Sequence, residues 1–309
     1  VSKEELAGIL YDSVNNRIRP LSEDILIYPG HGAGSACGKN MMKETVDTLA
    51  NQKSVNYALN GSFSKEGFIK ELTDNLPEPP TYFPSNVKLN QQGYIDFDIV
   101  LERSLKPLSI TKFKSLSNIH KTVILDVRSQ DHLRVGFVPG SIFIGLNGSF
   151  APWVGAIIKD ISTKILLVCN KGSESQAIMR LSRVGFDNVI GYLEGGFEIW
   201  KKSNQITDSI DSILPTNLKE IINSKISLID VRSKNERNMG YLKNSLNIPL
   251  NIIDLNIERL NKSTSYYIHC AGGYRSMIAC SILKRLGFDS PTDISGGFAE
   301  IRKAEFKIH

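Results

Sequence analysis

A long internal repeat constrains the fold of this chain more than any other feature of its sequence. The segment Ile124–Ser129 (ILDVRS) recurs about 100 residues later as Leu228–Ser233 (LIDVRS). Arg183–Asp187 (RVGFD) recurs at nearly the same spacing as Arg285–Asp289 (RLGFD). A period of about 100 residues is far longer than a solenoid repeat, so the sequence predicts two duplicated domains in tandem.

Each repeat alternates short apolar runs with helix-like segments. Thr122–Leu125 and Ile226–Ile229 are short, rich in β-branched residues and bounded by turn residues. Ser175–Val184 and Ser276–Leu286 have the spacing of helices, and each is followed by a glycine suited to a helix C-terminus. Short buried strands that alternate with helices predict an α/β fold, with a parallel sheet covered by helices on both faces.

These patterns divide the chain into four parts. The two repeats are predicted at 105–205 and 212–309, and the polar stretch Lys201–Asp211 is the link between them. Residues 1–85 form a separate first segment, and 86–104 connect it to the first repeat. The chain opens on Val1 within a helix-like run, so we expect the protein's true beginning to lie upstream.

The first segment does not share the repeat pattern. A strand at Ile25–Tyr28 leads into a glycine-rich turn that presents His31. Helices are predicted at Lys39–Gln52 and Lys65–Asn75. This segment is therefore not a third copy of the repeat.

Composition excludes several classes of protein. The chain is 41% hydrophobic and 22% charged, which is typical of a folded globular protein and excludes disordered and fibrous classes. No apolar run reaches the roughly 20 residues of a membrane helix, and no signal peptide opens the sequence. A net charge of +5 is too small and too dispersed to indicate nucleic-acid binding. Four cysteines without CxxC pairs favour a reducing cytoplasm.

The loop Cys270–Ser276 carries the strongest chemical signal in the sequence. Cys270 follows the predicted strand Tyr266–His269, and the loop leads into a helix. Loop N–H groups and a helix N-terminus that converge on a sulfur stabilise a thiolate, and Arg275 adds a fixed positive charge. The alternative reading is a structural cysteine before an ordinary glycine turn.

The second repeat resembles a rhodanese (sulfurtransferase) domain in its DVR motif, its cysteine loop and its Gly296-Gly297-Phe298 turn. The resemblance implies that Cys270 is the catalytic nucleophile and carries a persulfide. It implies a substrate-binding loop made of Ala271, Gly272, Gly273, Tyr274, Arg275 and Ser276. Related phosphatases have a loop one residue longer, so this loop length favours sulfur transfer. Tyr241, where many members have histidine, departs from the family at a structural position.

The first repeat also resembles a rhodanese domain, but its loop differs. Cys169 falls at the nucleophile position, while Glu174 stands where the second repeat has Arg275. A carboxylate there opposes both a thiolate and an anionic donor. We therefore expect the first repeat to be noncatalytic, with Cys169 as a small apolar residue at a strand end.

The motif Tyr28-Pro29-Gly30-His31-Gly32 resembles the last metal-ligand strand end of the metallo-β-lactamase fold. Together with two rhodanese-like repeats, it is similar to persulfide dioxygenase–sulfurtransferase fusions. The resemblance implies that 1–85 is the C-terminal part of a metallo-β-lactamase-like αββα domain, with His31 as a candidate metal ligand and Cys37 as a candidate substrate contact. The HxHxDH motif of that fold is absent, so we expect no metal in this chain, and Fe(II), or alternatively Zn, in the intact domain.

The resemblance implies a sulfurtransferase in persulfide and sulfide metabolism that acts on thiosulfate, sulfite and thiol persulfides. Three alternatives stay open: a zinc hydrolase of the glyoxalase II thioesterase type, a binding or regulatory module, and an arsenate reductase or phosphatase. A second copy of the chain stays open as a partner, and neither nucleic acid nor a membrane is expected as one.

Several polar residues recur in both repeats and favour a structural interpretation. Asp126 with Arg128, and Asp230 with Arg232, are expected to form helix caps or ion pairs, because they also occur in the repeat without an active loop. His269 alternates with the other residues of its strand and is expected to be packed rather than catalytic. His120, His132 and His309 have no evident partners and are expected at the surface.

Overall fold

The computed structural model describes residues 2–30, 43–74, 82–222 and 226–309. The chain divides into two compact units, Val1–Pro79 and Pro80–His309. Both repeats lie in the second unit, so their packing against each other belongs to one compact body.

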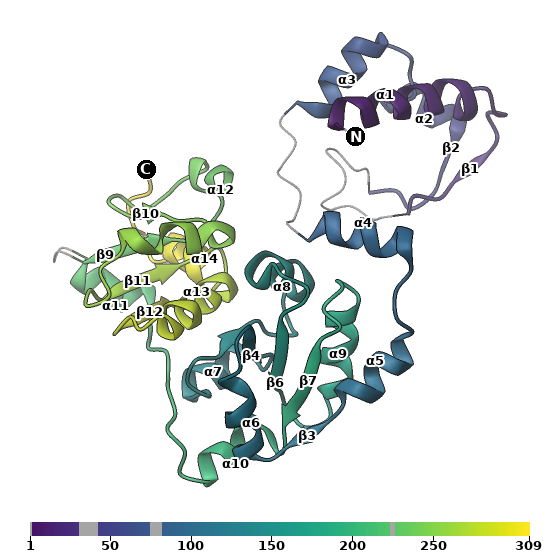
Figure 1. The fold of residues 1–309 in the computed structure, drawn as a ribbon. Helices are drawn as coiled ribbons and strands as arrows, with labels where there is room; N and C mark the ends of the chain where they lie inside the picture. Colours follow the sequence, from purple (N-terminus) through teal and green to yellow (C-terminus); the bar gives the residue numbers. More distant parts are fainter. Residues whose placement is uncertain (1, 31–42, 75–81, 223–225) are drawn as a thin grey trace. The chain divides into compact units, whose positions relative to one another are not determined.

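The first unit is small and mostly helical where it is described (Figure 1). Its elements are α1 (Lys3–Ser13), a π-helical turn (Val14–Ile18), β1 (Leu26–Ile27), β2 (Asp47–Thr48), α2 (Leu49–Val55) and α3 (Lys65–Thr73). Ser2 begins α1 with a capping box, in which its side chain accepts from Glu5 N and the Glu5 side chain accepts from Ser2 N. Helix α1 packs on α3 through an edge-to-face contact between the rings of Tyr11 and Phe68.

The helix predicted at Lys39–Gln52 is wrong for residues 43–48 and confirmed for 49–52, and Lys39 to Met42 lie outside the described residues. Asp47–Thr48 is a strand paired antiparallel with β1, and the helix starts only at Leu49. The Thr48 hydroxyl accepts from Asn51 N, because a side-chain cap at that position satisfies a free N–H of the first helical turn. The helix predicted at Lys65–Asn75 agrees with α3 up to Thr73, and Asn75 lies outside the described residues.

The first repeat is a five-stranded parallel sheet in the order β3-β7-β6-β4-β5. Two helices precede it, and one of them, α5, contributes the buried Val100 to the core of the repeat. In chain order the elements are α4 (Phe83–Gln92), α5 (Phe97–Ser104), β3 (Pro107–Leu108), α6 (Ile110–Ser117), β4 (Thr122–Asp126), α7 (Gln130–Val135), β5 (Ile142–Phe143), α8 (Phe150–Ile158), β6 (Lys164–Val168), α9 (Glu174–Ser182), β7 (Val189–Leu193) and α10 (Gly196–Lys202).

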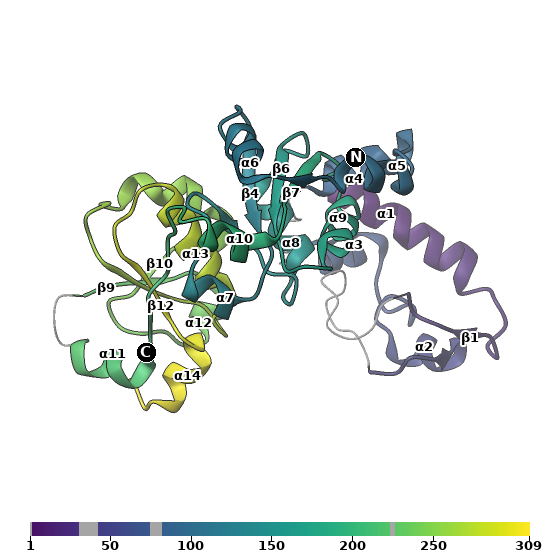
Figure 2. The same cartoon turned by 90° about the horizontal axis from the view of Figure 1, so that it is seen from below.

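The second repeat has the same topology, with strand order β10-β9-β11-β12-β8 and every pair parallel (Figures 1 and 2). Its elements are β8 (Ser212–Ile213), α11 (Pro215–Ile221), β9 (Ser227–Asp230), α12 (Lys234–Asn238), β10 (Leu246–Asn247), a 3₁₀ segment (Leu250–Arg259), β11 (Tyr266–His269), α13 (Tyr274–Arg285), β12 (Pro291–Ile294) and α14 (Gly297–Lys303). The prediction of two α/β domains with parallel sheets is confirmed.

Both faces of each sheet are buried, as the unbroken apolar runs predict. Along β6, Ile165 and Leu167 belong to one core cluster, while Leu166 and Val168 belong to another on the opposite face. Successive side chains of a strand point to opposite faces, so an unbroken apolar run fits a sheet that is covered on both sides.

The conserved spacing of the DVR motif in the two repeats reflects a buried ion pair, as predicted. Asp126 and Arg128 are joined by a 2.6 Å contact, and Asp230 and Arg232 by a 2.7 Å contact. Each arginine also donates to a glycine carbonyl eight residues further on. The guanidinium of Arg232 lies 3.7 Å from the centroid of the Phe298 ring, which adds a cation–π contact.

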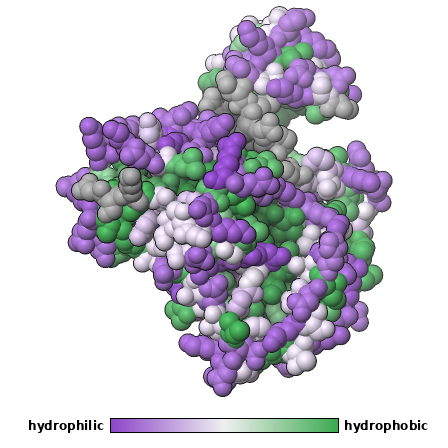
Figure 3. Space-filling model, turned by 60° about the vertical axis from the view of Figure 1, so that its left-hand side comes forward, coloured by the Kyte–Doolittle hydropathy of each residue, from purple (hydrophilic) through white to green (hydrophobic). Residues whose placement is uncertain are grey.

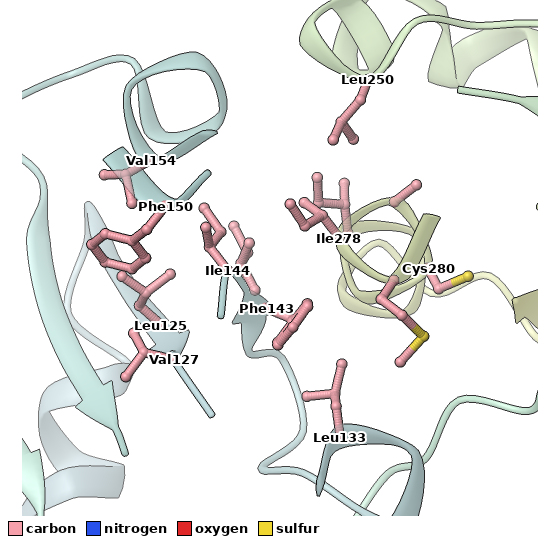
Figure 4. Packing of buried hydrophobic residues seen from close by; sticks show 14 of the residues in the cluster. Leu125, Val127, Leu133, Phe143, Ile144, Phe150, Val154, Leu250, Ile278 and Cys280 are labelled. Atoms are coloured by element: carbon pink, nitrogen blue, oxygen red, sulfur yellow. The ribbon is translucent and has the colours of Figure 1, made fainter. Parts of the chain in front are cut away.

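Helix α13 is buried along almost its whole length because it packs on both repeats. Its residues Ser276 to Leu283 are all buried. Figure 4 shows Phe143 and Ile144 of the first repeat on the side of this helix that carries Ile278, while the Cys280 side chain points away from them. The Phe143 N–H also donates to the Ser281 hydroxyl at 2.9 Å. The two repeats therefore share one hydrophobic core.

The surface carries mixed polar and apolar residues. Figure 3 shows polar side chains interspersed with smaller hydrophobic areas on one face. Exposed apolar side chains such as Val135, Ile206 and Leu255 are ordinary for a folded protein, whose surface is largely apolar by area. A search of the described residues for an apolar helix of membrane-spanning length finds none.

Because His269 is buried in its neutral form, the protein is expected to lose stability at acidic pH. His269 is fully buried and stacks on Phe298, and burial lowers its pKa to about 4. Because the unfolded chain takes up this proton first, the free energy of unfolding falls as the pH drops from about 6.5 to about 4. The loss from this group is about 3 kcal/mol.

Chemical denaturation of the wild type and of His269→Phe at several pH values measures this contribution. The variant keeps a ring against Phe298, and its stability is expected to fall by about 3 kcal/mol less over this pH range. Equal pH dependence in the two proteins would contradict the prediction.

Candidate functional site

Cys270 lies at the carboxyl end of β11, where the chain turns into α13. Its side chain is 1% exposed, and the Gly273 N–H donates to Sγ at 3.1 Å. Gly273 is the N-cap residue of α13 and has φ 93°, a left-handed conformation that favours glycine. This conformation directs a loop N–H at the sulfur, which is the arrangement that stabilises a thiolate.

The backbone at the start of α14 forms hydrogen bonds to the cysteine loop. Phe298 N donates to the Cys270 carbonyl at 2.7 Å, and Ala299 N donates to the Ala271 carbonyl at 3.0 Å. A Cβ added to Gly297 would lie 2.5 Å from the Cys270 carbonyl oxygen. Gly297, which has no side chain, therefore lets the start of α14 come close enough to the Cys270 carbonyl to form these hydrogen bonds.

Ser276 is the loop hydroxyl nearest to the sulfur. Its Oγ lies 3.6 Å from Cys270 Sγ and 2.7 Å from Asp293 Oδ1. It also lies 3.1 Å from the Gly273 carbonyl. Ser276 thus connects the cysteine to a buried carboxyl group on β12 that the sequence analysis did not identify.

Arg275 does not supply a free positive charge, in contrast to the expectation from the sequence. Its guanidinium forms a bidentate ion pair with Glu236, with contacts of 2.7 and 2.6 Å. The bond from Arg275 holds the pKa of Glu236 at about 2, so the carboxylate is ionised at neutral pH. The hydrogen bond to Glu236, and then the nearby Cys270, raise the pKa of Arg275. The guanidinium therefore interacts most strongly with the Glu236 carboxylate and less strongly with the Cys270 sulfur.

Tyr274 points toward the first repeat. Its hydroxyl donates to the Gly145 carbonyl at 2.7 Å, and burial raises its pKa. A Cβ on Gly148 would lie 2.3 Å from the Tyr274 ring, so only glycine leaves room for it. Tyr274 thus fastens the cysteine loop to the first repeat.

A cavity of about 520 Å³ opens beside Cys270, and both repeats line it. The second repeat contributes Cys270, Gly272, Tyr274 and Arg275. The first repeat contributes Arg128, Ser129, Gln130, Phe143, Gly145, Asn147, Gly148, Ser149 and Trp153. The space exceeds that needed for a small inorganic anion, and it is lined by amides, hydroxyls and the Trp153 ring.

The corresponding cysteine of the first repeat has a different environment. Cys169 is 2% exposed, and burial first, then the carboxylates of Glu174 and Asp126, raise its pKa to about 12. Glu174 accepts from the Gly172 N–H at 2.7 Å, so this loop donor is directed to a carboxylate. The geometry favours a noncatalytic first repeat.

The proposed metal ligand His31 and the candidate contact Cys37 lie outside the described residues. Among the residues that are described, no three His, Cys, Asp or Glu side chains come together as metal ligands. His120, His132 and His309 are exposed, and the His132 ring contacts the Ser129 hydroxyl at 2.9 Å.

Two residues of this site were missed in the sequence. Asp293 and Glu236 stand at positions where the first repeat has Tyr192 and His132. A residue-by-residue comparison of the two repeats could have found both, because each is a charge present only beside the loop that retains Arg275.

Replacing Arg275 by alanine is expected to lower the rate of sulfur transfer from thiosulfate. The loss corresponds to about 1.5–3 kcal/mol, the usual contribution of a hydrogen bond to a charged group. Steady-state kinetics with thiosulfate and with an uncharged organic trisulfide measure the effect. The trisulfide reaction is expected to lose less, since it presents no anion to the guanidinium. Equal losses with both donors would show that Arg275 acts only by holding Glu236.

Comparison with known proteins identifies the repeats. The family model described as "Rhodanese-like domain" matches residues 109–203 and 214–304. The chain is 35% identical over 74 residues to "Adenylyltransferase and sulfurtransferase uba4" of Ogataea parapolymorpha, an alignment that covers 24% of this chain and 19% of that protein. It is 34% identical over 79 residues to "Thiosulfate sulfurtransferase GlpE" of Pseudomonas aeruginosa, covering 25% of this chain and 68% of that protein. The chain thus spans only about a fifth of the first of these relatives.

Among solved structures, a metallo-beta-lactamase from Staphylococcus aureus is 25% identical to the chain, with a TM-score of 0.48. The match covers 62% of this chain and 51% of that one. The family match falls on both repeats and includes both cysteine loops. The chain therefore belongs to the rhodanese-like domain family, with one copy of the domain in each repeat.

Proposed function

We propose that this chain is a sulfurtransferase in persulfide and sulfide metabolism, and that Cys270 carries the transferred sulfur as a persulfide. The observation that carries the proposal is the Gly273 N–H that donates to Cys270 Sγ at the start of α13. The relatives that are named sulfurtransferases support the same class of reaction.

The proposed reaction has two steps that balance in atoms and charge. The Cys270 thiolate attacks the outer sulfur of thiosulfate, a sulfur–sulfur bond forms, and sulfite leaves with the electron pair of the bond that breaks. An acceptor such as cyanide or a thiolate then attacks the terminal sulfur, and the Cys270 thiolate leaves. The Gly273 N–H is placed to stabilise the anionic sulfur in both steps.

Treatment with thiosulfate followed by mass spectrometry tests the proposal. The peptide that contains Cys270 is expected to gain the mass of one sulfur, and addition of cyanide is expected to remove it as thiocyanate. If the added sulfur maps to Cys169 instead, or if no thiocyanate forms, the proposal is wrong.

The acceptor is proposed to be a low-molecular-weight thiol, for which the cavity beside Cys270 has room, or the smaller sulfite anion. We place the protein in the cytoplasm, where its buried free thiols Cys169, Cys270 and Cys280 would stay reduced.

We also propose that residues 1–85 belong to a metal-dependent persulfide dioxygenase domain ahead of the repeats. The resemblance around His31 supports it, with a zinc hydrolase as the alternative. Among the described residues no three candidate ligands come together, and the sulfur-transfer steps above use residues of the cysteine loop alone. Elemental analysis of these 309 residues is expected to find no stoichiometric metal. A full equivalent of iron would favour the dioxygenase, and one of zinc the hydrolase, each with ligands that include residues outside the described ones.

A further inference from the structure

A chain of polar contacts connects the first repeat to the sulfur of Cys270. Asp293 on β12 is fully buried, and its Oδ2 accepts from Arg134 Nη2 at 3.0 Å and from the Ser212 hydroxyl at 3.0 Å. Its Oδ1 lies 2.7 Å from Ser276 Oγ, which lies 3.6 Å from Cys270 Sγ. Arg134 belongs to α7 of the first repeat, so the contacts cross from one repeat to the other.

The number of available protons couples the protonation of Asp293 to that of Cys270 through Ser276. Ser276 has a single hydroxyl proton. When Asp293 is ionised, it takes that proton, and the hydroxyl presents only lone pairs to the sulfur, which suits a thiol that donates its S–H. When Asp293 is protonated, it donates to Ser276 Oγ, and the hydroxyl proton can turn to a thiolate, which then competes for it with the Gly273 carbonyl at 3.1 Å. The thiolate and the carboxylate therefore compete with each other.

We propose that Cys270 and Asp293 share one negative charge through Ser276, which passes the thiol proton to the carboxylate. The S–H bond of Cys270 breaks, a proton moves onto Ser276 Oγ, and the original hydroxyl proton moves to Asp293 Oδ1. One proton has crossed the pair, the net charge is unchanged, and no further reactant is needed. The inference rests on the proposed function, in which Cys270 reacts as a thiolate.

The surroundings of Asp293 make its carboxyl a suitable proton acceptor. Burial raises its pKa, while the hydrogen bonds from Ser276 and Arg134 oppose that rise. The groups that face it are Arg134 from α7, Ser212 from β8, and Ser276 and Cys280 from α13.

The groups near the sulfur do not disturb this pairing. Cys280 stays a neutral thiol, because burial raises its pKa well above the usual value. Arg275 also faces the sulfur, and its charge is paired with Glu236. Arg134 is thus the cation in direct contact with Asp293, and as a positioning residue it opposes the rise in the pKa of this carboxyl.

The contact between Ser276 and a buried carboxyl group is specific to the second repeat and is not a general feature of the fold. The first repeat has Ser175 where the second has Ser276, but it has Tyr192 in place of Asp293. The buried carboxyl therefore accompanies only the loop that carries Cys270 and Arg275.

The rate at which iodoacetamide alkylates Cys270, measured against pH in the full chain by mass spectrometry, tests the proposal. In Asp293→Asn, no carboxylate competes with the thiolate, so the half-maximal pH is expected to fall. The rate at pH 6 is then expected to rise by up to about tenfold, the effect of coupling near one pK unit. In Ser276→Ala, the sulfur loses the hydroxyl that can donate a hydrogen bond to a thiolate, so the rate at pH 6 is expected to fall.

Opposite shifts in these two variants would support the proposal, because a purely structural role gives none. Arg134→Gln, which keeps the carboxyl, is expected to shift the profile in the same direction as Asp293→Asn and serves if that variant does not fold. Arg285→Gln is the matched control, since it loses the 2.8 Å bond from α13 to the Gly140 carbonyl of the first repeat without touching Asp293. Its profile is expected to match the wild type.

An unchanged or higher half-maximal pH in both Asp293→Asn and Arg134→Gln would overturn the proposal. So would an equal shift in the Arg285→Gln control. Alkylation does not depend on sulfur transfer. If the alkylation profiles shift as expected but the protein forms no persulfide, the proposed function is wrong, while the proposal that Cys270 and Asp293 share one charge stands.

Discussion

Replacing Cys270 by serine is expected to reduce sulfur transfer from thiosulfate by on the order of 1000-fold or more, because the nucleophile itself is lost. A serine hydroxyl fits the same buried position but is a far weaker nucleophile at neutral pH. The measurement is thiocyanate formation from thiosulfate and cyanide.

Cys169→Ser is the matched control, since it makes the same change at the equivalent position of the first repeat. Its activity is expected to stay close to that of the wild type, because burial and Glu174 keep the Cys169 thiol protonated. Comparable losses in the two variants would contradict the assignment of a single active cysteine.

Replacing Asp230 by alanine is expected to destabilise the second repeat by about 3–5 kcal/mol. The change leaves the guanidinium of Arg232 without its partner, in a site where the arginine side chain is only 4% exposed. Burial tends to raise the pKa of Asp230, but the hydrogen bonds from Arg232 outweigh it, and the pKa is lowered. The carboxylate is therefore ionised over the whole neutral range, and the full effect is expected at pH 7.

Chemical denaturation followed by circular dichroism measures this loss. Asp254→Ala is the control, because Asp254 forms an ion pair with Lys159 that is largely exposed to solvent. A loss for Asp230→Ala no greater than that of the control would show that the buried arginine finds another partner.

Much of the fold was predictable because the repeats carry strong local signals. Apolar runs such as Ile165–Val168 can be accommodated only where both faces of a strand are covered, and this indicated a parallel sheet. The recurrence of Asp126 and Arg128 as Asp230 and Arg232 indicated a structural ion pair before any geometry was known. The helix predicted at Lys39–Gln52 failed where Thr48 caps a later start, since a side-chain cap is a weak signal beside a helical pattern.

The partners of the cysteine loop were less accessible to sequence reasoning. Arg275 was predicted to add a positive charge beside the sulfur. It lies near Cys270, but its guanidinium is paired with Glu236, which is distant in sequence. Such a contact depends on how α12 and α13 lie in space, and no local pattern encodes it.

By itself, the sequence determined the duplication, the α/β class of each repeat and the position of the reactive loop, because each follows from residues that are neighbours along the chain. Only the tertiary structure decided that α13 is buried between the two repeats, that Trp153 and Gln130 line the cavity beside Cys270, and that Arg134 reaches Asp293. The physical reason is that these contacts join side chains from different repeats. Their energy comes from shape and charge complementarity between surfaces, which no periodicity along the chain records.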